Sequence, residues 1–343
     1  MMTMRIIAAF VFFCVIHPFQ GVAQRNMKEL LDIEIMPVDR LIRPDYLKKG
    51  DLVAIVAPSG IVHQAETVYK AKDLLESWGL QVVIAPHVFD DGAHFAGTDL
   101  DRLTDLQEAM DNEEVRAIWT ARGGYGAARI VDSLNFEKIK SSPKWLIGYS
   151  DITVLHSAFH NAGMESMHAM MAVNLKADVD SIPLTIQTFK STLFGKRPKY
   201  EVAPNPDNRL GEAKGKLVGG NLTLLQTSLK TPTDLDTEGK IIFIEEIGEY
   251  KYHLDRMLRQ MERSGYFKGC AGLIVGDISN IRSNSTPFQM STEALILDIL
   301  KDYDFPILFD FPAGHEKTNV ALILGREVQL QVKKSGGKVK FKL

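Results

Sequence analysis

Short apolar runs alternate with segments of helical periodicity along the first half of the chain. Residues 50–58 read GDLVAIVAP, an apolar run between turn residues that predicts a buried strand, and residues 66–78 have the apolar spacing of a helix that ends at Gly79. The alternation continues, with strands predicted at 81–85, 117–120 and 144–148 and helices at 98–112, 127–134 and 152–161. Strands alternating with helices predict a parallel α/β sheet with helices on both faces, of the Rossmann or flavodoxin-like kind.

The periodicity fails at residues 196–210, where RPKYEVAPNPDNR contains three prolines. We interpret this segment as a linker between an N-terminal domain at 45–195 and a C-terminal domain at 211–343. The second domain is also α/β but richer in strand, with strands predicted at 214–218, 240–244, 272–275 and 327–343 and helices at 254–264 and 292–302. A chain of 343 residues is long enough for two such domains.

Residues 1–23 have the pattern of a secretory signal peptide. Arg5 supplies a positive charge, residues 6–16 form an apolar run, and residues 21–23 are small enough for a cleavage site after Ala23. The alternative is a membrane anchor, but the run is well short of the roughly 20 apolar residues that span a bilayer. The sequence therefore predicts a protein exported to the periplasm, without stable insertion in the membrane.

The net charge narrows the class of partner, and the cysteine count limits disulfides and cysteine metal clusters. A net charge of -3 argues against nucleic acid or a membrane surface, so a small molecule or another protein is the expected partner. Cys14 lies in the apolar run that cleavage removes, which leaves Cys270 without a partner for an internal disulfide or a cysteine metal cluster. Cys270 adjoins an apolar strand, which is typical of a buried, inert thiol.

Ser150 stands between a predicted strand and a predicted helix in WLIGYSDIT, residues 145–153. Its hydroxyl is expected at the carboxyl edge of the sheet, beside the unpaired N–H groups of the helix N-terminus. An acyl-transfer nucleophile needs this setting, and the backbone N–H of Asp151 can donate to an oxyanion. Serine is also a common helix N-cap, and this stretch alone favours the cap.

A serine nucleophile needs a base, and the histidines of the chain differ in context. His315 follows Gly314 in a loop between two apolar runs, where functional histidines are common. His156 and His160 have the i, i+4 spacing of a metal pair, but no acidic third ligand falls at a familiar spacing, so packed or solvated histidines are favoured. His168 lies among methionines and is expected in the core.

Two further features lie at predicted strand ends. Glu245 and Glu246 lie near the end of IIFIEEIGE, where one carboxylate can orient the histidine, and adjacent strand residues point to opposite faces. Residues 122–126, RGGYG, allow a close backbone approach that can provide a second N–H for an oxyanion hole. A plain glycine turn is the safer interpretation of that motif alone, and the GxGxxG and Walker patterns of nucleotide sites are absent.

Five motifs, in order, resemble the serine LD-carboxypeptidase family, which also contains the microcin-immunity peptidases. They are RGGYGAARI at 122–130, IGYSDITVLH at 147–156, GGNLTLLQTSL at 219–229, IIFIEEIGEYKYHLDRML at 241–258 and AGHEKTN at 313–319. The resemblance implies a triad in which Ser150 is the nucleophile, Glu245 the orienting carboxylate and His315 the base. It also implies oxyanion donors at the backbone N–H groups of Asp151 and Gly124.

The resemblance implies a reaction as well: hydrolysis, through an acyl-enzyme, of the amide between a diamino acid and the terminal D-alanine of a murein tetrapeptide. No metal or organic cofactor is required, and a homodimer is expected. Arg122 can pair with the terminal carboxylate of the substrate. The chain departs from the family at 168–170, where HAM replaces the common His-Gly-Pro, and at Ile323, where a proline is usual. Both changes alter the expected substrate groove.

Other functions fit parts of this pattern. The order Ser, Glu, His is also that of the α/β-hydrolases, but their GxSxG elbow needs glycine where Ile152 stands. Within the family, the nearer alternative is cleavage of another small peptide conjugate, as in microcin immunity. A secreted protein that binds a peptide or sugar without cutting it has no need of Ser150, Glu245 and His315 together, so an enzyme is favoured.

Overall fold

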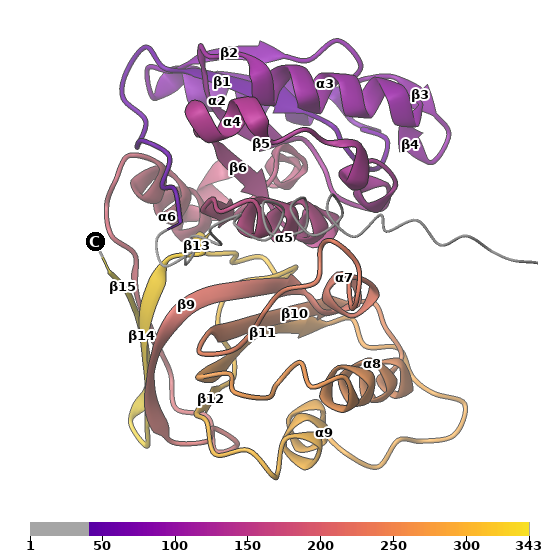
Figure 1. Ribbon diagram of the computed structural model, residues 1–343, viewed down its shortest axis with the longest axis vertical. Coiled ribbons are helices and arrows are strands. Elements are labelled where there is room, and N and C mark those ends of the chain that lie inside the picture. The colour runs from indigo at the N-terminus through magenta and orange to yellow at the C-terminus, as the bar shows by residue number, and fades with distance from the viewer. Residues whose placement is uncertain (1–40, 343) are drawn as a thin grey trace, which may run out of the picture. The chain divides into compact units, whose positions relative to one another are not determined.

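The computed structural model describes residues 41–342, and the predicted signal peptide lies outside them. Within this range the chain forms two large sheets, one of six and one of seven strands (Figure 1). A small ribbon, β3 (Asp91–Gly92) and β4 (Phe95–Ala96), stands apart from both. No helix within residues 41–342 is long and apolar enough to cross a membrane.

The first sheet combines five strands of the N-terminal half with one from the C-terminal half. Its order is β13-β7-β6-β5-β1-β2, and all neighbours are parallel except β13 and β7. The strands are β1 (Leu52–Val56), β2 (Gln81–Ile84), β5 (Val115–Thr120), β6 (Trp145–Gly148), β7 (Ser166–His168) and β13 (Leu322–Leu324). The parallel sheet predicted from the alternation is confirmed.

Helices cover both faces of the first sheet, because successive strand residues point to opposite cores. Ile55 of β1 belongs to one apolar cluster with Leu75, whereas its neighbour Val56 belongs to another with Leu106. The helices of this half are α2 (Ala65–Ser77), α3 (Asp99–Asp111), α4 (Glu137–Ser141), α5 (Thr153–Asn161) and α6 (Pro183–Leu193). Leu75 lies on α2 and Leu106 on α3, so these two helices pack on opposite faces, as the sequence predicted.

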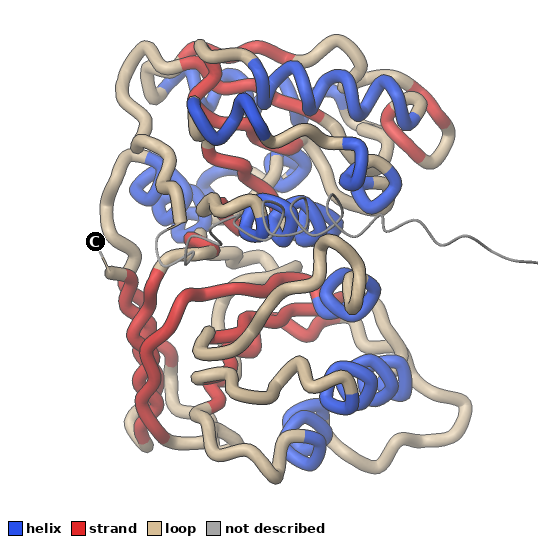
Figure 2. The backbone as a smooth tube through the Cα atoms, in the orientation of Figure 1, coloured by secondary structure: helices blue, strands red, loops and turns tan. Residues whose placement is uncertain are grey.

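The second sheet has the order β12-β11-β10-β9-β14-β15-β8. Its strands are β8 (Lys199–Val202), β9 (Gly211–Asn221), β10 (Ile241–Ile247), β11 (Gly272–Ser279), β12 (Ile307–Leu308), β14 (Glu327–Lys333) and β15 (Gly336–Phe341). Strands β9 to β12 are parallel, whereas β14, β15 and β8 pair antiparallel. In Figure 2 its three helices lie together beside the parallel strands: α7 (Leu222–Thr227), α8 (Lys251–Arg263) and α9 (Thr292–Ile299).

The helix predicted at 127–134 is wrong. The segment forms two short 3₁₀ turns, Ala127–Arg129 and Val131–Ser133. Eight residues are too few for helix propensity to sustain an α-helix. Tertiary contacts decide instead, because Ala127 and Val131 are buried and the Ala127 amide is bound by a side chain from another segment.

Two short strands do not follow the predicted division of the chain into an N-terminal domain, a linker and a C-terminal domain. Residues 199–202, within the segment that we interpreted as a linker, form β8 at the edge of the second sheet. Leu322–Leu324 lies far along the C-terminal half but forms β13, which pairs with β7 of the first sheet. Cys270 is buried and free, and burial raises the pKa of its thiol to about 12, which fits an inert core residue.

Candidate active site

Ser150 follows β6 and begins a 3₁₀ turn, Ser150–Ile152, that leads into α5. Its φ is +63°, in the left-handed region that residues other than glycine rarely adopt. Tyr149 and Ile152 occupy the N-cap positions of the turn and of α5, so Ser150 does not fill the cap role that the stretch alone favoured. A strained serine between a strand and a helix is the backbone arrangement that presents a nucleophile in other hydrolases.

The glycine turn at 122–126 lies against Ser150. A Cβ on Gly123 would stand 3.1 Å from Ser150 Cβ and 3.3 Å from both Ser150 Oγ and the amide nitrogen of Asp151. A side chain at 123 would therefore crowd Ser150 and the Asp151 amide, which glycine avoids. Gly124 follows with a φ of +100°, and residues 41–342 provide no acceptor for its amide N–H.

A buried guanidinium anchors this turn. Arg102 of α3 is 1% exposed, and its Nη1 donates to the carbonyl oxygens of Pro58, at 2.6 Å, and Gly126, at 2.9 Å. Its Nη2 pairs with Asp99. Pro58 lies in the loop after β1 and Gly126 ends the glycine turn. Arg102 therefore fixes the two loops relative to each other.

The side chain of Asp151 points into the protein from the residue next to Ser150. It is 1% exposed, and its Oδ2 accepts the backbone N–H of Ala127 at 2.9 Å. Burial raises the pKa of Asp151 above its ordinary value, and the positive charge of Arg102 partly opposes that rise. The carboxyl thus ties the end of the glycine turn to the start of α5.

Arg122 braces the same region from the opening of the glycine turn. Its Nη1 donates to the carbonyl of Ile61 at 2.5 Å, and the Gly60 amide donates to the Gly123 carbonyl at 3.0 Å. The Nε of Arg122 lies 3.8 Å from the Cβ position of Gly124. A guanidinium has five N–H donors, so Arg122 retains donors for a ligand. Its pairing with a substrate carboxylate stays a prediction.

Glu245 and His315 form a close pair at the ends of the second sheet. Glu245 of β10 is fully buried, and its Oε2 lies 2.6 Å from Nδ1 of His315. The His315 side chain is 13% exposed. Gly314 makes the approach possible: its φ is +142°, and a Cβ there would stand 2.9 Å from Asp277 Cβ and 3.2 Å from Glu245 Cβ.

Glu246 points to the opposite face of β10, as adjacent strand residues do. Its Oε2 accepts the amide and hydroxyl of Thr223 at 2.8 and 2.7 Å, and its Oε1 accepts the side-chain amide of Asn221 at 3.1 Å. Oε1 also accepts the N–H of Ile247 at 2.8 Å. These four bonds occupy the Glu246 carboxylate, so only its neighbour is directed to His315.

Negative charge surrounds the imidazole. Burial lowers the pKa of His315, but the hydrogen bond to Glu245 and the charges of Glu245, Glu246 and Asp277 outweigh it, so the pKa lies above its ordinary value. Asp277 of β11 accepts the Glu316 amide at 3.1 Å, and burial raises its own pKa to about 6. The arrangement stabilises His315 in the form that has accepted a proton, as a general base requires.

Tyr149 connects the serine segment with the histidine. Its ring centroid lies 4.9 Å from that of His315 and 5.7 Å from that of His168. Its hydroxyl accepts a hydrogen bond from Asn174 at 3.0 Å, and burial raises its pKa to about 12. The residue next to Ser150 thus packs on the ring of His315.

The three other histidines singled out from the sequence, His156, His160 and His168, are buried or partly buried. His156 bonds the Gly148 carbonyl through Nε2 at 3.0 Å and the Ser166 hydroxyl through Nδ1 at 2.9 Å. Burial lowers the pKa of His156 and of His160 to about 4, and His168 is fully buried. In the part of the chain that the structure describes, no group of three or more His, Cys, Asp or Glu side chains could hold a metal ion.

Sequence reasoning missed three residues that shape the site. Asp277 could have been found, because it ends the apolar run GLIVG just as Glu245 ends its own. Tyr149 could have been suspected from its place beside Ser150. Arg102 gives no signal, since an arginine in a polar helix is ordinarily solvated.

A strained serine, a glycine turn and a buried carboxylate–histidine pair, held between two α/β domains, define a serine hydrolase class of fold and site. The LD-carboxypeptidase N-terminal domain matches residues 53–169, and the LD-carboxypeptidase C-terminal domain matches residues 214–330. The chain belongs to the LD-carboxypeptidase family and is a serine peptidase.

Individual relatives agree with this assignment. A Bacillus subtilis protein described as a probable murein peptide carboxypeptidase is 36% identical over 292 residues, which cover 84% of this chain and 91% of the relative. The crystal structure of muramoyltetrapeptide carboxypeptidase from Oxalobacter formigenes aligns with a TM-score of 0.78 at 29% identity, covering 85% of this chain and 99% of the other. The microcin C7 self-immunity protein MccF, with aspartyl sulfamoyl adenosine, aligns with a TM-score of 0.79 over 88% of this chain and 98% of its own. At 17% identity, MccF shows the shared fold alone.

Proposed function

We propose that this chain is a carboxypeptidase that removes the terminal D-alanine of murein tetrapeptides by cutting its amide to a diamino acid. The observation that carries the proposal is the 2.6 Å pairing of Glu245 with His315, whose ring packs on the residue next to Ser150. The substrate is supported by the murein peptide in the description of the Bacillus subtilis relative and by the muramoyltetrapeptide in that of the Oxalobacter formigenes protein.

In this reaction Ser150 Oγ attacks the carbonyl carbon of the diamino acid while Nε2 of His315 takes its proton. Glu245 holds Nδ1–H and stabilises the imidazolium that forms. The tetrahedral intermediate then collapses, the C–N bond breaks, and His315 protonates the amine of the departing D-alanine. Water attacks the resulting ester, gives a proton to His315, and displaces Ser150, which recovers its proton from the imidazolium.

The oxyanion is held by backbone donors in this proposal. We assign this role to the N–H groups of Asp151 and Gly124, because the glycine turn lies close to Ser150. A Cβ on Gly123, the residue before Gly124, would stand 3.3 Å from both the Ser150 hydroxyl and the Asp151 amide nitrogen. Such fixed donors stabilise the negative charge that develops on the carbonyl oxygen. Arg122 pairs with the terminal carboxylate, which distinguishes a carboxypeptidase substrate from an internal peptide bond.

We propose further that the chain is exported to the periplasm after cleavage near Ala23 and acts there as a homodimer. The export proposal rests on the pattern of residues 1–23. Mass spectrometry of the protein recovered from the periplasm, followed by light scattering, tests both points. A full-length chain found only in the cytosol contradicts export, and a monomer at all concentrations contradicts the dimer.

The central experiment measures free D-alanine released from murein tetrapeptide by the purified protein and by Ser150→Ala. Wild type is expected to release D-alanine, and the variant to lose a factor of about 10⁴ or more in kcat/KM while it keeps the wild-type thermal unfolding midpoint. Equal activity in both proteins would remove Ser150 from the mechanism. The absence of D-alanine release, with other peptides cut, would show that the substrate is wrong.

Cleavage of another small peptide conjugate is the second candidate, favoured by the fold shared with MccF. Aspartyl sulfamoyl adenosine separates the two functions. Release of aspartate from this compound in preference to D-alanine from tetrapeptide would favour the microcin-immunity reaction. Binding of peptide without turnover of either compound would favour the non-catalytic binder.

A further inference from the structure

The antiparallel part of the second sheet carries an unusual charge on its outer face. Residues such as Val328, Leu330 and Val332 of β14 are buried, so the residues between them face solvent. The solvent-facing charged residues of β9, β14, β15 and β8, counted together with Lys342, are seven lysines and three glutamates. The lysines are Lys199, Lys214, Lys216, Lys333, Lys338, Lys340 and Lys342, and the glutamates are Glu201, Glu212 and Glu327. The face is therefore basic, although the whole chain has a net charge of -3.

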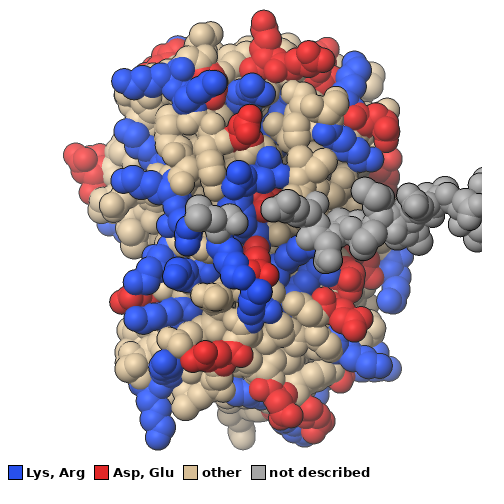
Figure 3. Space-filling view, turned by 60° about the vertical axis from the view of Figure 1, so that its left-hand side comes forward, with Lys and Arg blue, Asp and Glu red and all other residues tan. Residues whose placement is uncertain are grey.

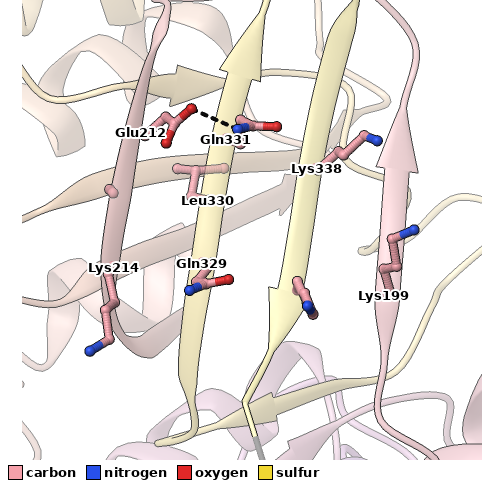
Figure 4. Close-up of a pocket in the computed structure, with 9 residues that line it drawn as sticks. Lys199, Glu212, Lys214, Gln329, Leu330, Gln331 and Lys338 are labelled. Atoms are coloured by element: carbon pink, nitrogen blue, oxygen red, sulfur yellow. Dashed lines mark hydrogen bonds between the residues drawn. The ribbon is translucent and has the colours of Figure 1, made fainter.

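Figure 3 brings this side of the molecule forward, and Lys and Arg side chains gather across its middle. A cavity of about 420 Å³ lies over the sheet (Figure 4). Its polar lining consists of Lys199, Lys214, Gln329, Gln331, Lys338 and Lys340 with one acidic residue, Glu212. None of the triad residues lines it, so this is a second location, separate from the candidate active site.

Three of these lysines form a row with one glutamine. Lys340 pairs in register with Lys199 on one side and with Gln329 on the other, and Gln329 pairs with Lys214. The row crosses four neighbouring strands without an acidic residue. We call Lys199, Lys214, Gln329 and Lys340 the lysine row.

The lysine row does not stabilise the folded protein. Like charges directly opposite each other on a sheet are destabilising. Lys199 and Lys214 pair with Glu201 at 3.1 Å and Glu327 at 3.2 Å, exposed pairs that contribute little, and Lys340 has no ion pair with any described residue. Lysine on an edge strand guards against aggregation, which accounts for Lys199 on β8, but Lys214 and Lys340 lie on inner strands.

We infer that the lysine row docks the enzyme on polymeric murein by binding carboxylates of wall peptides next to the one being cut. The inference rests on the proposed function. A carboxypeptidase substrate ends in a free carboxylate, and a polymer that bears many such peptides presents many of them. Three ammonium groups carried by neighbouring strands complement that array, and the Gln329 amide can donate to peptide carbonyls.

A membrane fits this face less well than the polymer does. Proteins that bind a bilayer surface usually combine basic residues with apolar anchors that enter the lipid. Among the described residues, none of the exposed large apolar side chains belongs to β8, β9, β14 or β15. Charge alone is available here, which suits a hydrated anionic polymer.

The test compares Lys199→Gln/Lys214→Gln/Lys340→Gln with a control of equal charge change, Lys70→Gln/Lys72→Gln/Lys138→Gln. Of the control lysines, Lys70 and Lys138 are exposed and Lys72 is half-buried; all three lie outside the second sheet, paired with Glu66, Asp111 and Glu76 respectively. In sedimentation with insoluble murein at low salt, the lysine-row variant is expected to lose about tenfold in affinity and the control much less. Salt should weaken wild-type binding, and kcat/KM for soluble tetrapeptide should stay unchanged in both variants.

Three results overturn the inference: wild-type affinity in the lysine-row variant, an equal loss in the control, or a loss of binding to anionic phospholipid vesicles with murein binding intact. A single Lys340→Gln variant adds a stability readout. It is expected to unfold at or above the wild-type midpoint while binding murein more weakly, and a lower midpoint would assign Lys340 a structural role. Lysine-dependent murein binding without D-alanine release would leave the docking surface standing and remove the proposed reaction.

Discussion

The two halves of the site are built by different physical means. Around Ser150 the determinants are steric: a φ of +63°, a glycine at 123 whose added Cβ would stand 3.3 Å from the hydroxyl, and a buried guanidinium on two backbone carbonyls. Around His315 they are electrostatic, since three carboxylates raise its pKa against burial. The serine half therefore controls where atoms lie, and the histidine half controls which atoms carry protons.

This difference determines how each half should respond to substitution. A change near Ser150 should alter kcat through geometry and leave the pH profile in place. A change of charge near His315 should move the pH profile, with less effect on maximal rate unless the hydrogen bond to the imidazole is lost.

The largest effect is expected from the two adjacent glutamates of β10. Glu245→Gln keeps the shape but loses the negative charge at Nδ1 of His315, so kcat/KM for D-alanine release should fall about 10³ to 10⁴-fold. Glu246→Gln disturbs four hydrogen bonds on the other face and should cost about 1 to 3 kcal/mol of unfolding free energy, with a much smaller loss of rate. Steady-state kinetics and urea unfolding separate the two.

A reversed outcome, with Glu246→Gln inactive and Glu245→Gln active, would mean that the orienting carboxylate is the wrong residue. It would also contradict the electrostatic account of the histidine half, because the 2.6 Å contact with Glu245 would then have no part in setting the protonation of His315.

An intermediate effect is expected at Arg102, on the steric side. Arg102→Met leaves the Pro58 and Gly126 carbonyls without their donor and frees the glycine turn, so kcat should fall about 10 to 100-fold with KM nearly unchanged. Arg102→Lys restores one donor and should recover part of kcat. The acid limb of the pH profile should not move, because Arg102 does not raise the pKa of His315.

Arg129→Lys is the matched control, since Arg129 also pairs with Asp99 but is half exposed. It should retain wild-type kcat. A lower unfolding midpoint in Arg102→Met without a loss of kcat would reduce Arg102 to a structural residue.

The smallest effect is expected at Asp277, on the electrostatic side. Asp277→Asn keeps an oxygen for the Glu316 amide and removes a negative charge that favours the imidazolium. The pKa of His315 should therefore fall, the neutral base should persist to lower pH, and the acid limb of kcat/KM should move down by about half a pH unit. Because the pKa of Asp277 is about 6, its charge is mostly lost below that pH and the shift should be smaller there.

Glu316→Gln serves as the comparison, because Glu316 is exposed and is not among the main charges that raise the pKa of His315. Its acid limb should stay close to wild type. An upward shift in Asp277→Asn would contradict the electrostatic account of the histidine half.

Much of the fold followed from local pattern. Buried strands such as β1 and β10 have apolar runs between turn residues, and α3 begins after Thr98, whose hydroxyl caps it in a capping box. These features depend on residues close in the chain, so periodicity and turn chemistry suffice to predict them. The 3₁₀ turns at 127–134 and strand β13 were not predicted, because each depends on a contact with a distant part of the chain.

Local pattern and motif were enough to predict the alternation of strands and helices, the family, and the residues Ser150, Glu245 and His315, whose catalytic roles stay predictions. Only the tertiary structure shows that Glu245 contacts His315 at 2.6 Å, that Ser150 takes a left-handed φ, and that Arg102 is buried between two loops. The reason is physical. Glu245 and His315 are 70 residues apart and Arg102 and Pro58 are 44 apart, so their contacts depend on how whole elements pack and leave no period in the sequence.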